Sequence, residues 1–264
     1  MELNSKQLSI ALEAVSKASE KLKELFRGNL SVTLKPGHDP TQIVSEADME
    51  SETILRNILD KSFPNYGFFS EESEPYQIDA ELIWIIDPLC GSYFYSRGLS
   101  QWSVSLALLQ KKEVILSVIS NPYDNEIFWA LKNQGSFLNG QKIRVSDISN
   151  IENSIISISS RDLKPSSYLH NANKIIDKTI RLITMDNHWV LAQLAAGRIE
   201  SVIRTEQPCY EIAAGSLLVS EAGGKFTDFN GGLLNIERNK LRSNNILASN
   251  GLIHNNLIDL LNTT

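Results

Sequence analysis

Apolar residues recur at helical spacing in two segments near the start of the chain. In residues 5–27 they fall every three or four positions, which predicts an amphipathic surface helix. A second helix is predicted over residues 47–62 and is stopped by Pro64. Asp48 and Glu52 are four positions apart in this helix, so both carboxylates are expected on one face near its N-terminus.

Apolar runs separated by polar or turn residues predict strands in the part of the chain that follows. The predicted strands are residues 67–69, 84–86, 102–109, 113–120, 126–131, 135–138 and 142–145. The polar or turn residues between the strands at 102–109, 113–120 and 126–131 favour an antiparallel meander there. Asn139-Gly140 is typical of a type I′ hairpin turn that joins the strands at 135–138 and 142–145. After the run 84–86 come Asp87, Pro88 and Gly91, so we expect a buried strand to end there at an exposed polar turn.

Strands and helices alternate from about residue 153 onward. Strands are predicted at residues 155–159, 180–184 and 200–204, and helices at 167–178, 188–196, 210–222 and 251–261. This alternation predicts a parallel or mixed sheet covered by helices. We therefore expect two halves, an antiparallel α+β half over residues 1–150 and an α/β half over residues 151–264.

Composition and charge narrow the classes of function. The chain has 264 residues, of which 42% are hydrophobic and 21% are charged, as in ordinary globular proteins. Its net charge of −6 argues against nucleic acid as the main partner, because binding to the phosphate backbone needs clustered Lys and Arg. No apolar run approaches the roughly 20 residues of a membrane span, and the N-terminus lacks the pattern of a signal peptide. We expect no membrane partner and a cytoplasmic location.

Acidic residues recur where predicted strands or helices begin or end. They are Asp48, Glu71 with Glu72, Asp87, and Glu211 at the start of the helix predicted over 210–222. Oxygen ligands from several segments are what Mg²⁺ requires, and Mg²⁺ often shares its coordination with a substrate phosphate. The pattern favours a site for Mg²⁺ and a phosphate.

Several longer motifs carry a resemblance to a known family. In chain order they are Ile43-Val44-Ser45-Glu46-Ala47-Asp48, Ser70-Glu71-Glu72-Ser73, Trp84-Ile85-Ile86-Asp87-Pro88-Leu89-Cys90-Gly91-Ser92, Gly135-Ser136-Phe137-Leu138-Asn139-Gly140, Ala195-Ala196-Gly197-Arg198, Tyr210-Glu211-Ile212-Ala213-Ala214-Gly215 and Glu221-Ala222-Gly223-Gly224. The chain resembles the inositol monophosphatase superfamily of Mg²⁺-dependent, Li⁺-sensitive phosphatases, which includes fructose-1,6-bisphosphatases and 3′-phosphoadenosine 5′-phosphate phosphatases. The resemblance implies a layered αβαβα sandwich, a homodimer, and metals at the junction of the two halves. It also implies hydrolysis of a small phosphate monoester, such as an inositol or sugar phosphate.

The resemblance also implies a set of metal ligands. By similarity, Glu71, Asp87 and the carbonyl of Leu89 are the ligands of the first, activating Mg²⁺. Glu211 would place another acid on a second metal.

Catalytic and phosphate-binding residues are implied in the same way. Ser92 stands where the family commonly has Thr, and together with Asp48 it would polarise the attacking water. Glu72 is a further catalytic candidate. Backbone N–H groups around Gly91 and Ser92 would hold the phosphate.

Two positions depart from the family pattern at the second metal. Cys90 stands where the family has an Asp that touches the metals, and Tyr210-Glu211 replaces Trp-Asp. Because sulfur is a poor ligand for Mg²⁺, three interpretations stay open. Cys90 could be an apolar filler while Glu211 holds the second metal, or it could favour Zn²⁺ or Mn²⁺ with help from Cys209. Alternatively the second site is lost, which leaves a slow enzyme or a catalytically impaired relative acting in binding or regulation.

The substrate end of the site also differs from the family. By ungapped alignment, Arg204 falls where inositol-hydrolysing members carry a Glu, and Asp186 and Asn187 fall in a loop that meets the substrate. An Arg at this position would suit a second phosphate or a carboxylate, since guanidinium pairs bidentately with either. The other interpretation of Arg204 is a solvated residue at a strand end. His188 is expected to pack at a helix start rather than to act in catalysis.

Overall fold

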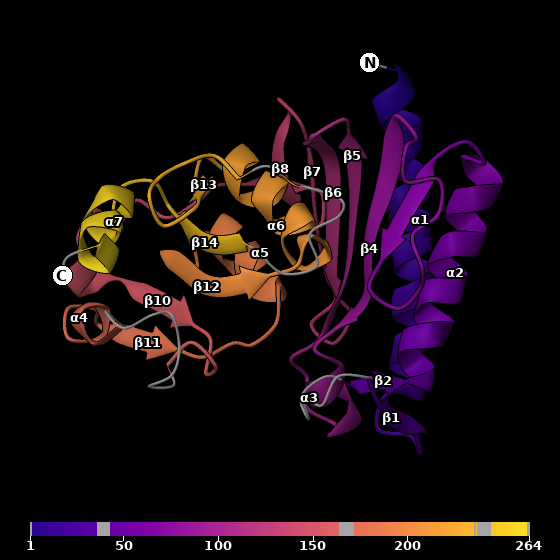
Figure 1. Ribbon diagram of the computed structural model, residues 1–264, viewed down its shortest axis with the longest axis horizontal. Coiled ribbons are helices and arrows are strands. Elements are labelled where there is room, and N and C mark those ends of the chain that lie inside the picture. The colour runs from indigo at the N-terminus through magenta and orange to yellow at the C-terminus, as the bar shows by residue number, and fades with distance from the viewer. Residues whose placement is uncertain (1, 36–42, 164–171, 235, 237–243, 263–264) are drawn as a thin grey trace.

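Five layers of secondary structure make up the protein. The computed structural model describes residues 2–35, 43–163, 172–234, 236 and 244–262. Figure 1 shows a pair of helices, a seven-stranded sheet, a second pair of helices, a five-stranded sheet and a last pair of helices, stacked in that order. The predicted layered αβαβα sandwich is confirmed.

The outer helices α1 (Glu2–Leu25) and α2 (Glu46–Ser62) cover one face of the larger sheet. Asp48 and Glu52 are both buried on one face of α2, as the four-residue spacing predicts. Ahead of α2, β1 (Val32–Leu34) pairs antiparallel with β2 (Ile43–Ser45). This pairing was not predicted.

The larger sheet has the strand order β3-β4-β5-β6-β7-β8-β9. Its strands are β3 (Gly67–Ser70), β4 (Leu82–Cys90), β5 (Ser103–Gln110), β6 (Glu113–Asn121), β7 (Glu126–Leu131), β8 (Gly135–Leu138) and β9 (Gln141–Ile143). Strands β5 to β7 form the predicted antiparallel meander, and β8 and β9 form the predicted hairpin. The antiparallel pairing continues from β4 to β5 and from β7 to β8, whereas β3 runs parallel to β4. Asn139 and Gly140 have φ values of 48° and 80°, and these positive values fit the predicted type I′ turn.

The prediction of an exposed turn after residue 86 is wrong. Strand β4 continues through Asp87 and Pro88 to Cys90, and every residue from Ile83 to Cys90 is buried. Its pairing with β5 becomes irregular between Asp87 and Cys90, because Pro88 has no N–H to contribute to the ladder. The acid is therefore delivered into the protein interior rather than to its surface.

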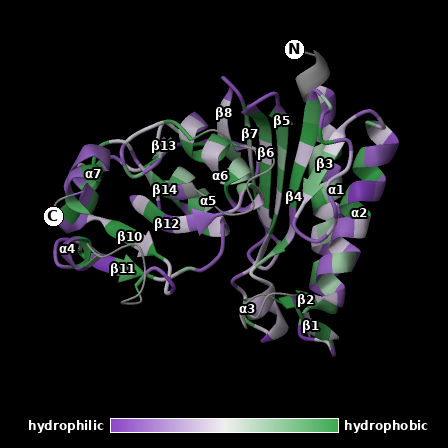
Figure 2. Cartoon of the chain, in the orientation of Figure 1, coloured by the Kyte–Doolittle hydropathy of each residue, from purple (hydrophilic) through white to green (hydrophobic). Residues whose placement is uncertain are grey.

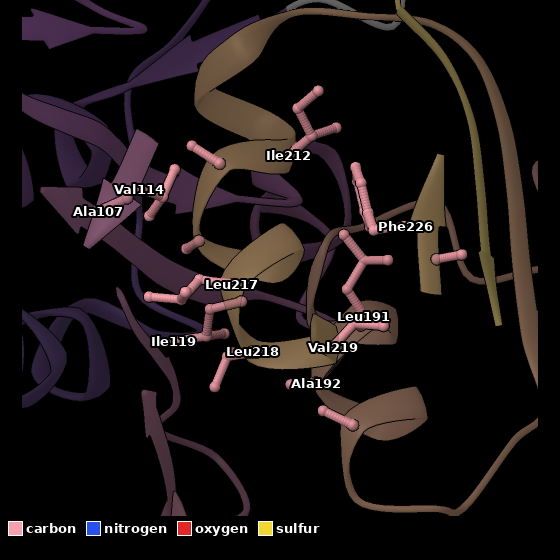
Figure 3. Close-up of a cluster of buried hydrophobic side chains, with 14 of the residues drawn as sticks. Ala107, Val114, Ile119, Leu191, Ala192, Ile212, Leu217, Leu218, Val219 and Phe226 are labelled. Carbon is pink, nitrogen blue, oxygen red and sulfur yellow. The ribbon is translucent and has the colours of Figure 1, made fainter. Parts of the chain in front are cut away.

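Two helices lie between the sheets. They are α5 (Trp189–Ala195) and α6 (Cys209–Glu221). Most residues of α6 are apolar and buried, because one sheet covers the helix on each side. Figure 3 shows Leu217 and Leu218 of α6 among side chains such as Ile119 of the larger sheet, with Leu191 of α5 beside them. These residues belong to the buried cluster that joins the layers.

The smaller sheet is mixed, as predicted. Its order is β11-β10-β12-β14-β13, with parallel pairs only at β10-β11 and β10-β12. The strands are β10 (Ile155–Ile158), β11 (Arg181–Ile183), β12 (Ser201–Gln207), β13 (Lys225–Thr227) and β14 (Asn244–Ser249), and the outer helices are α4 (Ala172–Ile176) and α7 (His254–Asn262). The helix expected over 167–178 lies partly outside the described residues, and α4 accounts for the part that is described.

Each sheet is built from one of the two predicted halves, since β9 ends at Ile143 and β10 begins at Ile155. That the halves form separate units stays a prediction. Figure 2 shows hydrophobic residues concentrated on the strands of the larger sheet and hydrophilic ones on the outer side of α2. Among the described residues, no helix combines the length and the apolar character needed to cross a membrane.

Candidate functional site

A cavity of about 480 Å³ is lined by residues from both halves of the chain. Nine of the predicted site residues line it: Glu71, Asp87, Leu89, Cys90, Gly91, Ser92, Asp186, Arg204 and Glu211. Asp48, Glu72 and Asn187 are not among the lining residues. The two halves thus meet in one cavity that carries most of the predicted chemistry.

Glu71, Asp87 and the carbonyl of Leu89 make up what we call the oxygen site. The parallel pairing of β3 with β4 places Ser70 opposite Ile86, so the acids that follow these two residues come together at the ends of the strands. Asp87 is 1% exposed, and its Oδ1 accepts no hydrogen bond from the described residues. Burial and the charge of Glu71 raise the pKa of Asp87 well above its usual range. A divalent cation would relieve both penalties.

Lys35 provides a positive charge at the edge of the oxygen site. Its Nζ lies 2.6 Å from Oε1 of Glu71 and 2.7 Å from Oε1 of Glu72. Burial opposes the charge of Lys35, but the two carboxylates outweigh this effect and raise its pKa above the ordinary value. Burial and the neighbouring Glu71 raise the pKa of Glu72 to about 7. Glu72 is therefore placed against Lys35 rather than in the wall of the cavity.

Asp48 and Ser92 form a hydrogen-bonded pair beside the oxygen site. The hydroxyl of Ser92 donates to Asp48 Oδ1 at 2.6 Å or to the Leu89 carbonyl at 2.8 Å. The other Asp48 oxygen, Oδ2, accepts from the backbone N–H of Ser45 at 2.7 Å and from its hydroxyl at 2.6 Å. Burial raises the pKa of Asp48, and these hydrogen bonds partly counteract the effect. The pair is fixed by the start of α2 and by the end of β4.

Gly91 turns the chain from β4 into the short helix α3 (Ser92–Ser96). Its φ is +89°, and a Cβ there would lie 2.6 Å from the carbonyl oxygen of Gln101. No other residue adopts this conformation in so little space without strain. The glycine therefore sets the approach of the chain to the cavity wall.

Cys90, His188 and Asp87 make up a second group, which we call the thiol site. One ligand atom from each of the three side chains lies within 4.8 Å of the other two. The backbone N–H of His188 donates to Cys90 Sγ at 3.0 Å, and His188 Nε2 lies 3.1 Å from Glu211 Oε2. Cys209 is not part of this group and lies in the core cluster, so the help from Cys209 that one of the three interpretations required is replaced by His188.

Arg204 is 3% exposed, so the interpretation of a solvated strand-end residue is wrong. Its guanidinium donates to the carbonyls of Ile203 at 2.8 Å and Ser157 at 3.2 Å, and also to the carbonyl of Met185. Burial lowers the pKa of Arg204 to about 10, which still leaves it charged at neutral pH. Arg161, whose Nη2 donates to the Thr205 carbonyl at 2.8 Å, lines the same part of the cavity.

Asp186 and Asn187 occupy different places although they are adjacent in sequence. Asp186 lines the cavity and accepts hydrogen bonds from the backbone N–H and the hydroxyl of Ser160. Asn187 is 1% exposed and is not a lining residue; a Cβ added at Gly91 would lie 3.6 Å from Asn187 Cβ. Asn187 is thus a neighbour of the glycine turn rather than part of the cavity surface.

Three residues of the site were missed or discounted in the sequence. They are Lys35, Arg161 and His188, which come from loops and from a helix start. His188 and Cys90 are 98 positions apart and share no motif, so only the fold brings them together. For Lys35, the acids at 71 and 72 were a signal that a cation should be nearby.

Comparison with known proteins agrees with these features. The family model described as "Inositol monophosphatase family" matches residues 3–264. An inositol-1-monophosphatase of Rhizobium meliloti is 33% identical over 232 residues, which cover 85% of this chain and 86% of the relative. A fructose-1,6-bisphosphatase/inositol-1-monophosphatase of Thermotoga maritima is 34% identical over 225 residues, which cover 83% and 82%. A protein called Nus factor SuhB from Pasteurella multocida is 30% identical over 85% of this chain and 86% of its own length.

Solved structures give the same result. The extragenic suppressor protein SuhB of Bartonella henselae superposes with a TM-score of 0.89 at 31% identity, covering 98% of this chain and 99% of its own. A Thermotoga maritima inositol monophosphatase gives a TM-score of 0.86 at 28% identity, with 97% of both chains covered. With the family model matching residues 3–264, its layers superposed and Glu71, Asp87 and Glu211 lining one cavity, the chain belongs to the inositol monophosphatase family.

Proposed function

We propose that the protein is a Mg²⁺-dependent phosphatase that hydrolyses a small phosphate monoester. The observation that carries the proposal is the arrangement of the oxygen site next to the Ser92–Asp48 pair at one wall of the cavity. The donor set fits Mg²⁺, because Glu71, Asp87 and the Leu89 carbonyl offer only oxygen and one carboxylate oxygen has no partner among the described residues. Bound there, Mg²⁺ would supply charge that polarises the phosphoryl group and a water molecule.

Ser92 and Asp48 are proposed to orient and deprotonate the attacking water. A hydroxyl has one proton and two lone pairs, so when Ser92 donates to Asp48 its oxygen can still accept a hydrogen bond from water. Asp48 is buried and its pKa is raised, which makes it a better proton acceptor than an exposed carboxylate. Gly91 would let backbone N–H groups approach the phosphate closely.

The test is release of inorganic phosphate from a panel of phosphate esters with Mg²⁺, Mn²⁺ or Zn²⁺. The expected result is Mg²⁺-dependent turnover of at least one inositol or sugar phosphate. The absence of turnover with every metal and ester would instead support the second candidate, a catalytically impaired family member that acts in binding or regulation. Two observations favour that candidate: Cys90 at a metal position, and the contact of Lys35 with Glu71 and Glu72.

A preference for substrates with a second anionic group belongs to the same proposal. Arg161 and Arg204 both line the cavity, where they would attract a second phosphate or a carboxylate. Arg204→Ala should raise KM several-fold for a bisphosphate and leave a simple monoester unaffected. Arg198→Ala, which removes a guanidinium paired with Glu126 outside the cavity, is the matched control. Equal losses on both substrates would remove this specificity role.

The location and the type of partner are inferred from the sequence pattern and charge, and the assembly is inferred from the family. We expect a cytoplasmic homodimer whose partner is a small phosphate ester rather than nucleic acid or a membrane. Light scattering of the purified protein measures the assembly directly, and a monomeric mass would contradict it.

A further inference from the structure

The thiol site has the side chains of a metal centre unlike the oxygen site beside it. It brings together a sulfur, an imidazole nitrogen and a carboxylate oxygen, all within 4.8 Å of one another. In a tetrahedral zinc site, bonds of about 2.0–2.3 Å place neighbouring ligand atoms about 3.3–3.8 Å apart. The three atoms would therefore have to close by only about 1 Å, a shift within the range of small side-chain rotations.

The carboxylate oxygen of Asp87 that lacks a partner among the described residues, and which the oxygen site shares, supports cation binding at this group as well. Asp87 is 1% exposed, and its Oδ1 accepts no hydrogen bond from the described residues. A buried carboxylate oxygen without a donor carries a large desolvation penalty. A cation between Asp87 and Cys90 would remove that penalty.

The surroundings of Cys90 differ from those of an apolar filler. Cys90 Sγ accepts the backbone N–H of His188 at 3.0 Å and lines the cavity. Cys209, by comparison, is fully buried among the core side chains of α6 and both sheets. Glu211 Oε2 lies 3.1 Å from His188 Nε2, where it can orient the imidazole or provide a fourth ligand.

We propose that the thiol site binds a thiophilic divalent cation of the zinc type through Cys90 Sγ, a ring nitrogen of His188 and a carboxylate oxygen of Asp87. Sulfur and imidazole select Zn²⁺ over Mg²⁺, which prefers oxygen and near-octahedral geometry. On binding, the metal replaces the thiol proton, which passes to solvent. Asp87 belongs to both sites, so the two cations would share one carboxylate. The proposal concerns metal binding and does not require that the protein hydrolyses phosphate esters.

Titration of the chelator-treated protein with Co²⁺ and Cd²⁺ tests the proposal, because both ions report a bound thiolate by a charge-transfer absorption band. Zn²⁺ should then abolish the Co²⁺ band by displacement, at concentrations at which Mg²⁺ has no effect. We expect one equivalent to produce the band in the parent protein. Cys209→Ser removes the other cysteine and should retain the band, whereas Cys90→Ser should lose it and weaken Zn²⁺ binding at least about tenfold.

Two further variants separate loss of the ligand from loss of the fold. Cys90→Asp keeps a ligand without sulfur, so it should bind divalent cations and show no charge-transfer band. His188→Gln should keep the band and bind Zn²⁺ about tenfold more weakly. Thermal unfolding of each metal-free variant shows whether it is folded. A band that survives in Cys90→Ser, a parent protein without a band at saturating Co²⁺, or Zn²⁺ binding no tighter than Mg²⁺ would overturn the proposal. None of these readouts depends on turnover, so an absence of phosphatase activity leaves the test intact.

Discussion

The oxygen site and the thiol site lie side by side and share Asp87, yet they are assembled in different ways. Glu71, Asp87 and Leu89 come from the ends of two adjacent parallel strands, β3 and β4, so local strand pairing alone brings them together. The thiol site joins the end of β4 to the start of α5, across the junction of the two halves. One site therefore depends on a single sheet, and the other on how the two halves pack.

The ligand types differ in the same way. The oxygen site has hard donors, and burial together with the charge of the neighbouring Glu71 raises the pKa values of Asp87 and Glu72. In the thiol site, burial and the charge of Asp87 raise the pKa of Cys90 well above its usual range, so the sulfur is neutral without a metal. A cation bound at the first site would thus balance the charge of the carboxylates, whereas a cation bound at the second site would have to displace the proton of the thiol.

The largest effect is expected from Asp87→Asn, because Asp87 belongs to both sites. The amide should lower Mg²⁺ affinity and phosphatase activity by more than about a thousandfold, since a buried ligand and its charge are lost together. The metal-free fold should be at least as stable, because one of several repelling charges is gone. Calorimetric Mg²⁺ titration and thermal unfolding measure the two quantities. Asp124→Asn, in a surface turn, is the matched control. Undiminished Mg²⁺ affinity would show that the ligand set is wrong.

The difference between the two sites also explains what could be predicted from the sequence. Acids that follow short apolar strands indicated a site for Mg²⁺ and a phosphate, and the family resemblance then implied Glu71, Asp87 and the Leu89 carbonyl as its ligands. Even there, the local pattern indicated an exposed turn, since Asp-Pro usually ends a strand, and only the sheet pairing shows that β4 continues inside the protein.

The thiol site could not be predicted in the same way. The sequence indicated only that His188 packs at a helix start. Its place beside Cys90 depends on how α5 packs against α6 and β6, which no sequence spacing reports. The β1–β2 pair and Lys35 were missed for a similar reason. Strands of three residues, such as β1 and β2, are too short to show a periodic pattern. The role of Lys35 becomes visible only in the structure, where its ammonium group pairs with Glu71 and Glu72.

A smaller effect is expected from Ser92→Ala, which changes a residue next to the oxygen site and leaves the proposed metal-ligand side chains in place. Loss of the hydroxyl that links water to Asp48 should lower kcat about a hundredfold and leave Mg²⁺ affinity nearly unchanged. Ser92→Thr keeps the hydroxyl and should retain most of the activity. Steady-state kinetics at saturating Mg²⁺ provide the measurement. Ser96→Ala, in the same short helix, is the control. An equal loss in Ser92→Thr would mean that packing rather than the hydroxyl matters.

Cys90→Asp replaces the sulfur of the thiol site by carboxylate oxygens, so the two sites would no longer differ by a sulfur ligand. We expect a gain in Mg²⁺ affinity and in Mg²⁺-dependent turnover of about tenfold to a hundredfold, because a carboxylate suits Mg²⁺ better than a thiol does. Rates measured across a range of Mg²⁺ concentrations with one hydrolysable ester test this. If the variant is slower than the parent at every concentration, the cysteine is part of a working site and the added charge near Asp87 and Glu211 binds a proton instead.

The smallest effect concerns the pH dependence of stability in the metal-free protein. The pKa of Glu72 is about 7 in the fold and near 4.5 when the group is free of these interactions, so between these values the folded state holds a proton that the unfolded state has released. The contribution of Glu72 to stability should therefore fall as pH rises from 4.5 to 7, and Glu72→Gln should remove about 1 kcal/mol of that fall. The raised pKa values of Asp48, Glu71 and Asp87 add slope of the same sign and the lowered pKa of His254 opposes it, so the difference between the two proteins, rather than the total slope, measures Glu72. Lys35 contributes no slope in this range, because its raised pKa keeps it charged in both states. The Cys90 thiol also contributes no slope, since its pKa lies above the range.

Urea unfolding with a chelator at both pH values gives the slope, and Glu50→Gln, an exposed glutamate on α2, is the control. Saturating Mg²⁺ should reduce the fall further, because it favours the charged carboxylates that the metal-free fold disfavours. A slope that is the same in the parent and in Glu72→Gln would mean that the metal-free fold does not raise the pKa of Glu72. The electrostatic difference between the carboxylates of the oxygen site and the neutral thiol of the thiol site would then be smaller than the geometry indicates.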